Sequence, residues 1–316
     1  MTEAGSGDIQ KAARLLRAGR LVAFPTETVY GLGADASSAE AIARLYAVKG
    51  RPGGHPVIVH FADAAKAFTW ASEVPEAARK LADKFWPGPL TMILKRATHV
   101  GDFVTGGQDT VGLRVPVHPL ARELLEAFGG GLAAPSANRF GRVSPTTAQH
   151  VREDLGEDVD LILDGGPCGV GIESTIVDPS RGTPVLLRPG GISIGELEKA
   201  LGTKVASPDA DAPRVSGSLA SHYAPRTPAR LVAAPELERE IARLGTKAAV
   251  LAFGVPDERV DFWIRQSRDP ALYAQALYAA LRDLDATGAE AILIESPPDS
   301  PEWRAVLDRL RRAARD

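Results

Sequence analysis

Cysteine is nearly absent from this chain of 316 residues, since Cys168 is the single one. One thiol can form neither an internal disulfide nor a cysteine-rich zinc module. Long hydrophobic runs are missing as well: the longest apolar stretches have only the length of a strand, so we expect no membrane-spanning segment. The first residues, MTEAGSGDIQK, lack the apolar core of a signal peptide. These absences predict a reduced, cytoplasmic protein with no membrane partner.

An excess of positive charge is also absent, because the formal net charge is −3. An RNA-binding translation or ribosome-maturation factor needs a large cationic surface, so this composition disfavours that function. The pattern G-x-x-x-x-G-K-[ST] does not occur, which excludes a P-loop. His55 and His60 are five residues apart and point to opposite faces of a strand, and neither has a clustered Cys or Asp partner. The sequence therefore predicts no metal site formed by protein ligands.

The length suits two domains better than one. Residues 1–204 mix helices and strands without strict alternation, which predicts a twisted mixed sheet with flanking helices; one of these helices should begin at Ser144-Pro145. Residues 205–228, VASPDADAPRVSGSLASHYAPRTP, lose all periodicity and are rich in Pro, Ser, Ala and Asp, as is typical of a linker. Residues 229–316 nearly alternate strand and helix, which predicts a smaller parallel α/β domain.

Two polar groups of residues are the strongest chemical signal. A helix capped by Ser38 ends at Gly50, so Lys49 and Arg51 lie at its exit. Ser136 and Asn138, in PSAN, directly follow an apolar strand. Two cations with a hydroxyl and an amide suit a polyphosphate. The cations could equally stabilise the carboxyl end of the helix alone.

Two other patterns leave alternatives open. YGLGADA contains G-x-G-x-x-A, but a dinucleotide fold needs an acidic residue about 20 positions later. Lys49-Gly50-Arg51 occupies that region, so we expect Gly31 and Gly33 to form a tight turn beside a cavity. Arg114 lies inside the apolar strand VGLRVP, where a buried guanidinium needs an anion. That anion is either a core carboxylate or a ligand.

Nine segments between Ala23 and Ser193 occur in a characteristic order, and SHYAP follows them at 221–225: AFPTETVYGLGADA, VKGRP, PVIVHF, FWPGPLTMIL, TVGLRVP, LAAPSANRFGRVSPT, ILDGG, GIESTIVD and LLRPGGIS. In this order the chain resembles the threonylcarbamoyl-AMP synthases, in their long two-domain form. The resemblance implies a YrdC-like twisted mixed sheet with flanking helices around a cavity. It also implies a smaller Rossmann-like parallel α/β C-terminal domain.

The resemblance implies a nucleotidyltransferase (adenylyltransferase). L-threonine, bicarbonate or CO2, and ATP would give threonylcarbamoyl-AMP and pyrophosphate, with Mg²⁺ held mainly by the substrate phosphates. The product would pass to a tRNA-modifying transferase that acts on the adenosine beside the anticodon, and a weak direct contact with tRNA stays open. A carbamoyltransferase of hydrogenase maturation shares the fold, but its cysteine-rich zinc modules are missing here.

Residue roles follow from the same resemblance. His55 departs from the asparagine that many members have in KGRPxxNP, and the linker with Tyr223 is expected to fold over the cavity when nucleotide is bound. The catalytic signature would be Lys49, Arg51, Ser136 and Asn138. ATP would contact Arg51, His55, Thr110, Ser136, Ser144, Arg188 and Tyr223. L-threonine would contact Thr28, His60, Arg114, Ala134 and Ser174.

Overall fold

The computed structural model describes residues 6–217, 219 and 222–314, and it divides into two compact units. The described residues of 1–140, 145–169 and 173–218 form the first unit, and those of 141–144, 170–172 and 219–316 form the second. The predicted linker is thus shared between the units. Its residues Ser218, Ala220 and Ser221 lie outside the described part of the chain. The predicted domain boundaries at 204 and 229 stay predictions.

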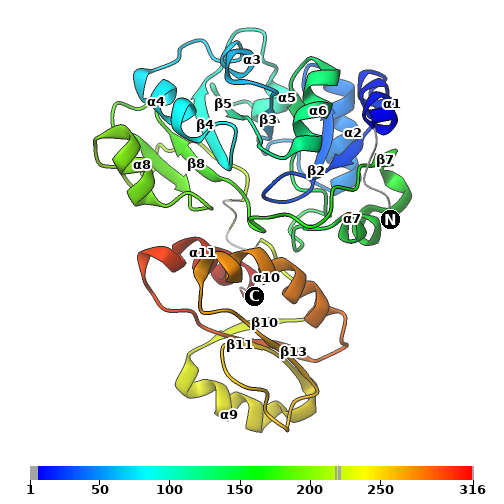
Figure 1. Ribbon diagram of the computed structural model, residues 1–316, viewed down its shortest axis with the longest axis vertical. Helices are drawn as coiled ribbons and strands as arrows, with labels where there is room; N and C mark the ends of the chain where they lie inside the picture. Colours follow the sequence, from blue (N-terminus) through cyan, green and yellow to red (C-terminus); the bar gives the residue numbers. More distant parts are fainter. Residues whose placement is uncertain (1–5, 218, 220–221, 315–316) are drawn as a thin grey trace. The chain divides into compact units, whose positions relative to one another are not determined.

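A mixed nine-stranded sheet forms the first unit, in the order β7-β1-β2-β6-β3-β5-β4-β8-β9 (Figure 1). β1 with β7, β3 with β5, and β4 with β8 are parallel, and the remaining neighbours are antiparallel. The strands are β1 Val22–Phe24, β2 Gly31–Asp35, β3 Ile58–His60, β4 Leu90–Lys95, β5 Thr110–Arg114, β6 Leu132–Ala133, β7 Leu161–Ile162, β8 Thr175–Asp178 and β9 Val185–Arg188.

Alternation along the strands places apolar side chains on both faces of this sheet. In β1, Val22 and Phe24 pack against α1 and α6, whereas Ala23 packs on the opposite side in the larger core with α2, α4 and α8. The helices are α1 Ser6–Arg17, α2 Ala39–Lys49, α3 Ala64–Phe68, α4 Glu76–Phe85, α5 Asp102–Thr105, α6 Pro119–Phe128, α7 Ala148–Leu155, the 3-10 turn η1 Gly156–Asp158, and α8 Ile194–Leu201.

The expectation of a tight turn at Gly31 and Gly33 is wrong. Both glycines lie in β2, which pairs antiparallel with β1, and neither has a positive φ. The reason for glycine is close packing. A Cβ on Gly33 would lie 2.9 Å from a ring carbon of Phe24, and one on Gly31 would lie 3.2 Å from the Cβ of Ala134. The chain reverses instead in the segment 25–30.

The helix expected at Ser144-Pro145 begins later, at Ala148. The Thr147 side chain accepts a hydrogen bond from the His150 amide and caps α7. The Pro145 carbonyl accepts from the Tyr30 amide at 2.9 Å, so this backbone serves the segment before β2 rather than a helix. The tendency of Ser144-Pro145 to begin a helix is here overridden by a tertiary hydrogen bond.

The second unit has a parallel four-stranded sheet in the order β10-β13-β11-β12, as predicted from its alternation. With the mixed sheet of the first unit, this confirms the predicted fold class. None of the helices in the described residues has the length and apolar character needed to cross a membrane. The elements are β10 Ala229–Val232, α9 Ala234–Leu244, η2 Gly245–Lys247, β11 Ala248–Ala252, β12 Phe262–Arg265, α10 Pro270–Asp285, β13 Ala291–Glu295, η3 Pro301–Trp303 and α11 Arg304–Ala313.

Candidate functional site

Strand register places most of the residues expected to bind L-threonine on one face of the sheet. His60 of β3 pairs with Arg114 of β5, and Arg114 pairs with Thr91 of β4 on its other side. Paired residues point to the same face, as do residues two positions apart. Ala134 joins this group because its amide donates to the carbonyl of Ile58, two residues before His60, at 3.0 Å.

Arg114 forms an ion pair with a carboxylate of the protein itself, that of Glu27. Its Nη2 donates to Glu27 Oε1 at 2.6 Å and its Nη1 to Thr28 Oγ1 at 3.0 Å. Arg114 is only 4% exposed and Glu27 only 9%, so water screens the pair little. The core carboxylate and the ligand are therefore not exclusive: Glu27 satisfies one side of the guanidinium, and Nε makes no hydrogen bond within the described residues.

Ser174 connects the same face to Arg188. The hydroxyls of Ser174 and Thr91 lie 2.8 Å apart. Arg188 donates from Nε and Nη2 to the Ser174 carbonyl, at 3.1 and 2.8 Å, and from Nη2 to its hydroxyl at 3.1 Å. Ser174, which is expected to bind L-threonine, is thus held by Arg188, which is expected to bind ATP.

His60 is a neutral imidazole in this environment. Burial first, and then the nearby positive charge of Arg114, lower its pKa to about 3. A neutral ring can both donate and accept a hydrogen bond, which suits an amino-acid hydroxyl or amine. His60 also meets the Phe24 ring edge-on, with centroids 6.4 Å apart.

Lys49 holds the loop that contains PSAN. As the last residue of α2, it precedes Gly50, whose left-handed φ of 63° ends the helix. Its Nζ donates to the carbonyls of Ser136 and Asn138 at 2.6 and 2.5 Å. Burial, followed by the charge of Arg51, lowers the pKa of Lys49 well below its ordinary value. The structure thus places three of the four signature residues together.

Arg51 lies beside an aromatic pair that the sequence did not reveal. Its Nη2 donates to the Pro56 carbonyl at 2.7 Å, and its guanidinium carbon is 5.6 Å from the centre of the Phe140 ring. The ring of His55 is 5.4 Å from Phe140. Burial, and secondarily Arg51, lower the pKa of His55. An aromatic face near a cation offers a surface on which a planar ring can stack.

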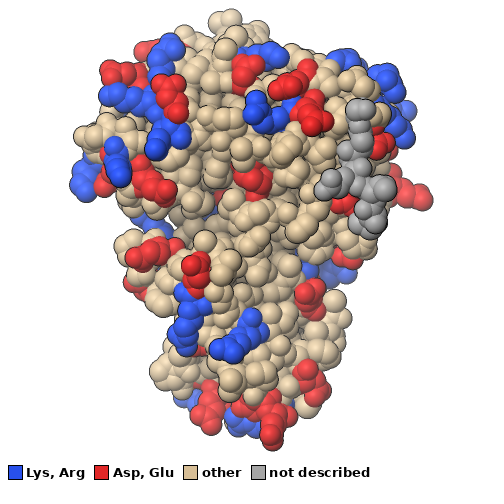
Figure 2. Space-filling view, viewed as in Figure 1, with Lys and Arg blue, Asp and Glu red and all other residues tan. Residues whose placement is uncertain are grey.

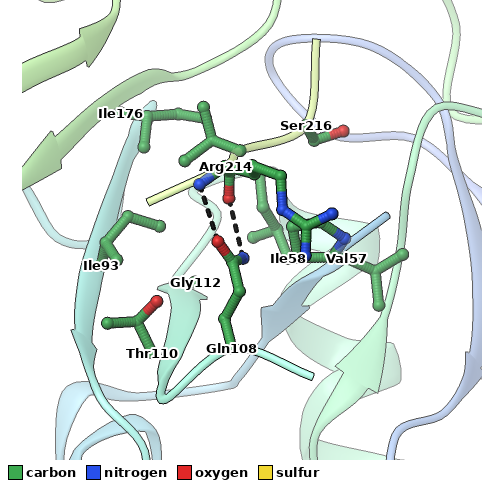
Figure 3. A pocket seen from close by; sticks show the side chains of 11 residues that line it. Val57, Ile58, Ile93, Gln108, Thr110, Gly112, Ile176, Arg214 and Ser216 are labelled. Atoms are coloured by element: carbon green, nitrogen blue, oxygen red, sulfur yellow. Dashed lines mark hydrogen bonds between the residues drawn. The ribbon is translucent and has the colours of Figure 1, made fainter. Parts of the chain in front are cut away.

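A small pocket opens on the same sheet face (Figure 3). Ile58, Ile93, Thr110, Gly112 and Ile176 line it from four neighbouring strands, and linker residues 214–216 line it from the other side. Val215 packs on Ile93 and Ile176. Thr110, expected to contact ATP, therefore faces the linker.

Gln108 binds the linker backbone in the way a neighbouring strand would (Figure 3). Its Oε1 accepts from the Arg214 amide at 2.7 Å and its Nε2 donates to the Arg214 carbonyl at 3.0 Å. Arg188 Nη1 donates to the Ser216 carbonyl at 2.8 Å. Arg188 thus binds both Ser174 and the linker.

Ser144 and Tyr223, both expected to contact ATP, belong to the second unit. The Ser144 carbonyl accepts a long hydrogen bond, 3.5 Å, from Arg282 Nε. Tyr223 has a φ of 61°, uncommon outside glycine. Its ring stacks on Tyr278 at 5.7 Å, and the guanidinium of Arg309 lies 5.3 Å away.

The chain matches known proteins over most of its length. Residues 14–190 match the family model described as "Telomere recombination", and residues 192–315 match "Threonylcarbamoyl-AMP synthase, C-terminal domain". A threonylcarbamoyl-AMP synthase of Pyrococcus abyssi is 40% identical over 97% of this chain and 94% of its own. One of Bacillus subtilis is 40% identical over 97% and 92%. The crystal structure of P. abyssi Sua5 complexed with L-threonine superposes with a TM-score of 0.92 at 38% identity, covering 99% and 96%.

The chain belongs to the threonylcarbamoyl-AMP synthase family.

Several residues of the candidate site were not predicted from the sequence. Glu27, Thr91 and Phe140 contact predicted site residues, and Gln108 binds the linker, but each looks ordinary in sequence. Glu27 in PTETVYG was the easiest of these residues to predict, because a buried arginine requires an anion and this acid stands in a matched motif.

Cys168 is buried, and burial with the charge of Glu27 raises its pKa to about 12. The described residues contain no group of three His, Cys, Asp or Glu arranged for a metal.

Removing Glu27 should destabilise the fold strongly. Glu27→Ala leaves Arg114 buried without its carboxylate, so we expect the free energy of unfolding in urea to fall by about 3–5 kcal/mol. The matched control is Glu126→Ala, whose ion pair with Arg122 is solvent-exposed at 3.8 Å and should be worth under about 1 kcal/mol. The double variant Glu27→Ala/Arg114→Met should lose less than Glu27→Ala alone. Equal losses for Glu27→Ala and Glu126→Ala would contradict this account.

Stability should depend on pH through His60. Its folded pKa of about 3 lies below the ordinary 6.5, so protons favour the unfolded chain. The contribution of the neutral His60 to the free energy of unfolding is fully present above pH 6.5 and is lost as the pH falls towards 3. His60→Asn removes it, and the free energy of unfolding should then decline less steeply across that window than in wild type. The exposed His99→Asn controls for losing a histidine, and superimposable pH curves for His60→Asn and wild type would rule the assignment out.

Weakening the Gln108 contact should release the linker. Gln108→Ala removes two hydrogen bonds to Arg214, so trypsin should cleave after Arg214 about 5- to 100-fold faster. Fragment masses identify the bond that is cut. Gln149→Ala, an exposed glutamine on α7, is the control. If Gln108→Ala and Gln149→Ala are cut equally fast, the side chain does not hold the linker.

Proposed function

We propose that this chain is a threonylcarbamoyl-AMP synthase that joins L-threonine, bicarbonate or CO2, and ATP. One observation carries the proposal: a single segment, residues 134–138, connects the two chemical groups. Its first residue lies beside Ile58, on the face that carries Arg114, and its carbonyls at 136 and 138 accept from Lys49. An amino-acid site and a phosphate site joined in this way suit a reaction between the two ligands.

The amino-acid end fits threonine. Arg114 is positioned to hold its carboxylate by a charge-assisted contact, with Thr28, His60, Ala134 and Ser174 around the remainder of the ligand. The threonine amine adds to CO2 with release of a proton, or condenses with bicarbonate with release of water, to give a carbamate. A carbamate oxygen then attacks the α-phosphorus of ATP, the bond to the β-phosphate oxygen breaks, and pyrophosphate leaves. Positioning and charge can accelerate such a transfer without a covalent protein nucleophile.

The cationic end fits the triphosphate. Arg51, with His55 and Phe140 near it, lies where phosphate and a planar base can be held, and Thr110, Ser136, Ser144, Arg188 and Tyr223 are the further proposed ATP residues. Lys49 serves chiefly to position the backbone of Ser136 and Asn138, because its donors face their carbonyls. An arriving phosphate would favour the charged form of its amine.

Mg²⁺ would enter with the nucleotide. The side-chain oxygens of Ser136 and Asn138 are neutral and could contribute ligands, while the buried cations around them disfavour an all-protein cage. The bound ion would neutralise the charge of the leaving pyrophosphate. We further propose that the labile product passes in the cytoplasm to a tRNA-modifying transferase. Acidic and basic side chains intermingle on the face seen in Figure 2, so direct tRNA contact through that face would be weak.

The product and one arginine test the proposal together. Pyrophosphate and threonylcarbamoyl-AMP should form from ATP only when threonine and bicarbonate are both present, as measured by coupled phosphate assay and mass spectrometry. Arg51→Ala should lower the rate about 10- to 1,000-fold through loss of a charged phosphate contact. The exposed Arg139→Ala, in the loop that follows Asn138, is the control. Adenylate formation without threonine, or a fully active Arg51→Ala, would refute the assignment.

A further inference from the structure

The outer edge of β12, in the second unit, is open. β12 pairs only with β11 among the described strands. The Gln266 amide donates to the Ala252 carbonyl of β11, so by alternation Phe262 and Ile264 also direct their backbone groups towards β11. Asp261, Trp263 and Arg265 then direct theirs outwards. No hydrogen bond to the outward groups of Trp263 or Arg265 is found within the described residues.

This edge is short and has a charged residue at each end, but it lacks the other usual protections against pairing. Residues 261–265 contain neither proline nor lysine, and the register with β11 has no bulge. The large apolar side chains most exposed among the described residues are Val117, Val255, Phe262 and Leu272. Phe262, which is 40% exposed, lies in β12, and Val255, which is 73% exposed, lies in the segment that leads into it. An open edge flanked by exposed apolar groups indicates a partner.

The sequence of the edge identifies that partner as a second copy. In Asp261-Phe262-Trp263-Ile264-Arg265, the charges at the two ends are opposite, and the centre is Trp263. An antiparallel pairing with a twofold axis at Trp263 sets Asp261 opposite Arg265 of the second copy, and the reverse. It also sets Phe262 opposite Ile264. The outward residues are those that exchange hydrogen bonds in this register, which yields about six bonds across the axis.

We propose that this protein self-associates through antiparallel pairing of β12, which joins two four-stranded sheets into one. The contact is independent of the proposed reaction and uses none of its residues. A short strand pair with a few exposed apolar side chains buries less than a standard interface, so we expect a dissociation constant of about 10–100 µM. Asp261 and Arg265 form no ion pair within the described residues, so both are available to the second copy.

Charge reversal tests the pairing and its register. Asp261→Arg sets arginine opposite arginine, and Arg265→Asp sets aspartate opposite aspartate. Each single variant should associate about 10- to 100-fold more weakly than wild type in sedimentation equilibrium, because like charges directly opposite each other repel. An equimolar mixture of the two variants should regain wild-type association, since every pair is then opposite in sign. The double variant D261R/R265D should regain it as well.

Equal melting temperatures would establish that all variants are folded, as expected for exposed side chains. The proposal is overturned if wild type sediments as a monomer up to about 0.5 mM. It is equally overturned if the single variants associate as tightly as wild type, or if their mixture stays monomeric. A wild-type edge that pairs only with a different protein would appear as the first of these results.

Discussion

The parallel pairing of β3 with β5 is the constraint on which the site depends. It sets His60 beside Arg114 and Ile58 beside Gly112, and the antiparallel β4 adds Thr91 and Ile93 to the same row. A slip of one residue would turn each of these side chains to the opposite, apolar face. Because the larger core fills that face with Val59, Met92, Leu113 and Val177, burial fixes the register. The packing of the core therefore determines the geometry of the proposed amino-acid site.

Buried cations are stabilised here by backbone as much as by acids. Arg114 meets Glu27, but Lys49 and Arg188 meet carbonyl oxygens of Ser136, Asn138, Ser174 and Ser216. Carbonyl dipoles satisfy the donors without cancelling the charge, so the positive potential remains for an anionic ligand. The same contacts order the loops that would enclose that ligand. This arrangement is compatible with the proposed local phosphate site in a chain of net charge −3.

Sequence predicted the elements that carry strong local signals. The helix ending at Gly50, the strand around Arg114 and the alternating pattern after residue 228 all agree with the structure. YGLGADA was misread because glycine marks turns and close approaches alike, and only the position of Phe24 distinguishes them. Glu27 and Thr91 were missed because their roles arise from strand pairing over long sequence distances. The contact of Arg188 with Ser174 depends on a register shift between Ile176 and Val177, which no local pattern encodes.

The linker is recognised mainly through its backbone. Gln108 binds both backbone groups of Arg214, Arg188 binds the carbonyl of Ser216, and only Val215 contributes a packed side chain between them. A Pro- and Ser-rich segment without periodicity can therefore dock specifically, which composition alone would not suggest. Because Arg188 also holds both the carbonyl and the hydroxyl of Ser174, movement of the linker away from the sheet would remove one of the contacts that orient its guanidinium. The position of the linker and the shape of the proposed threonine site are thus parts of one hydrogen-bond network rather than separate features.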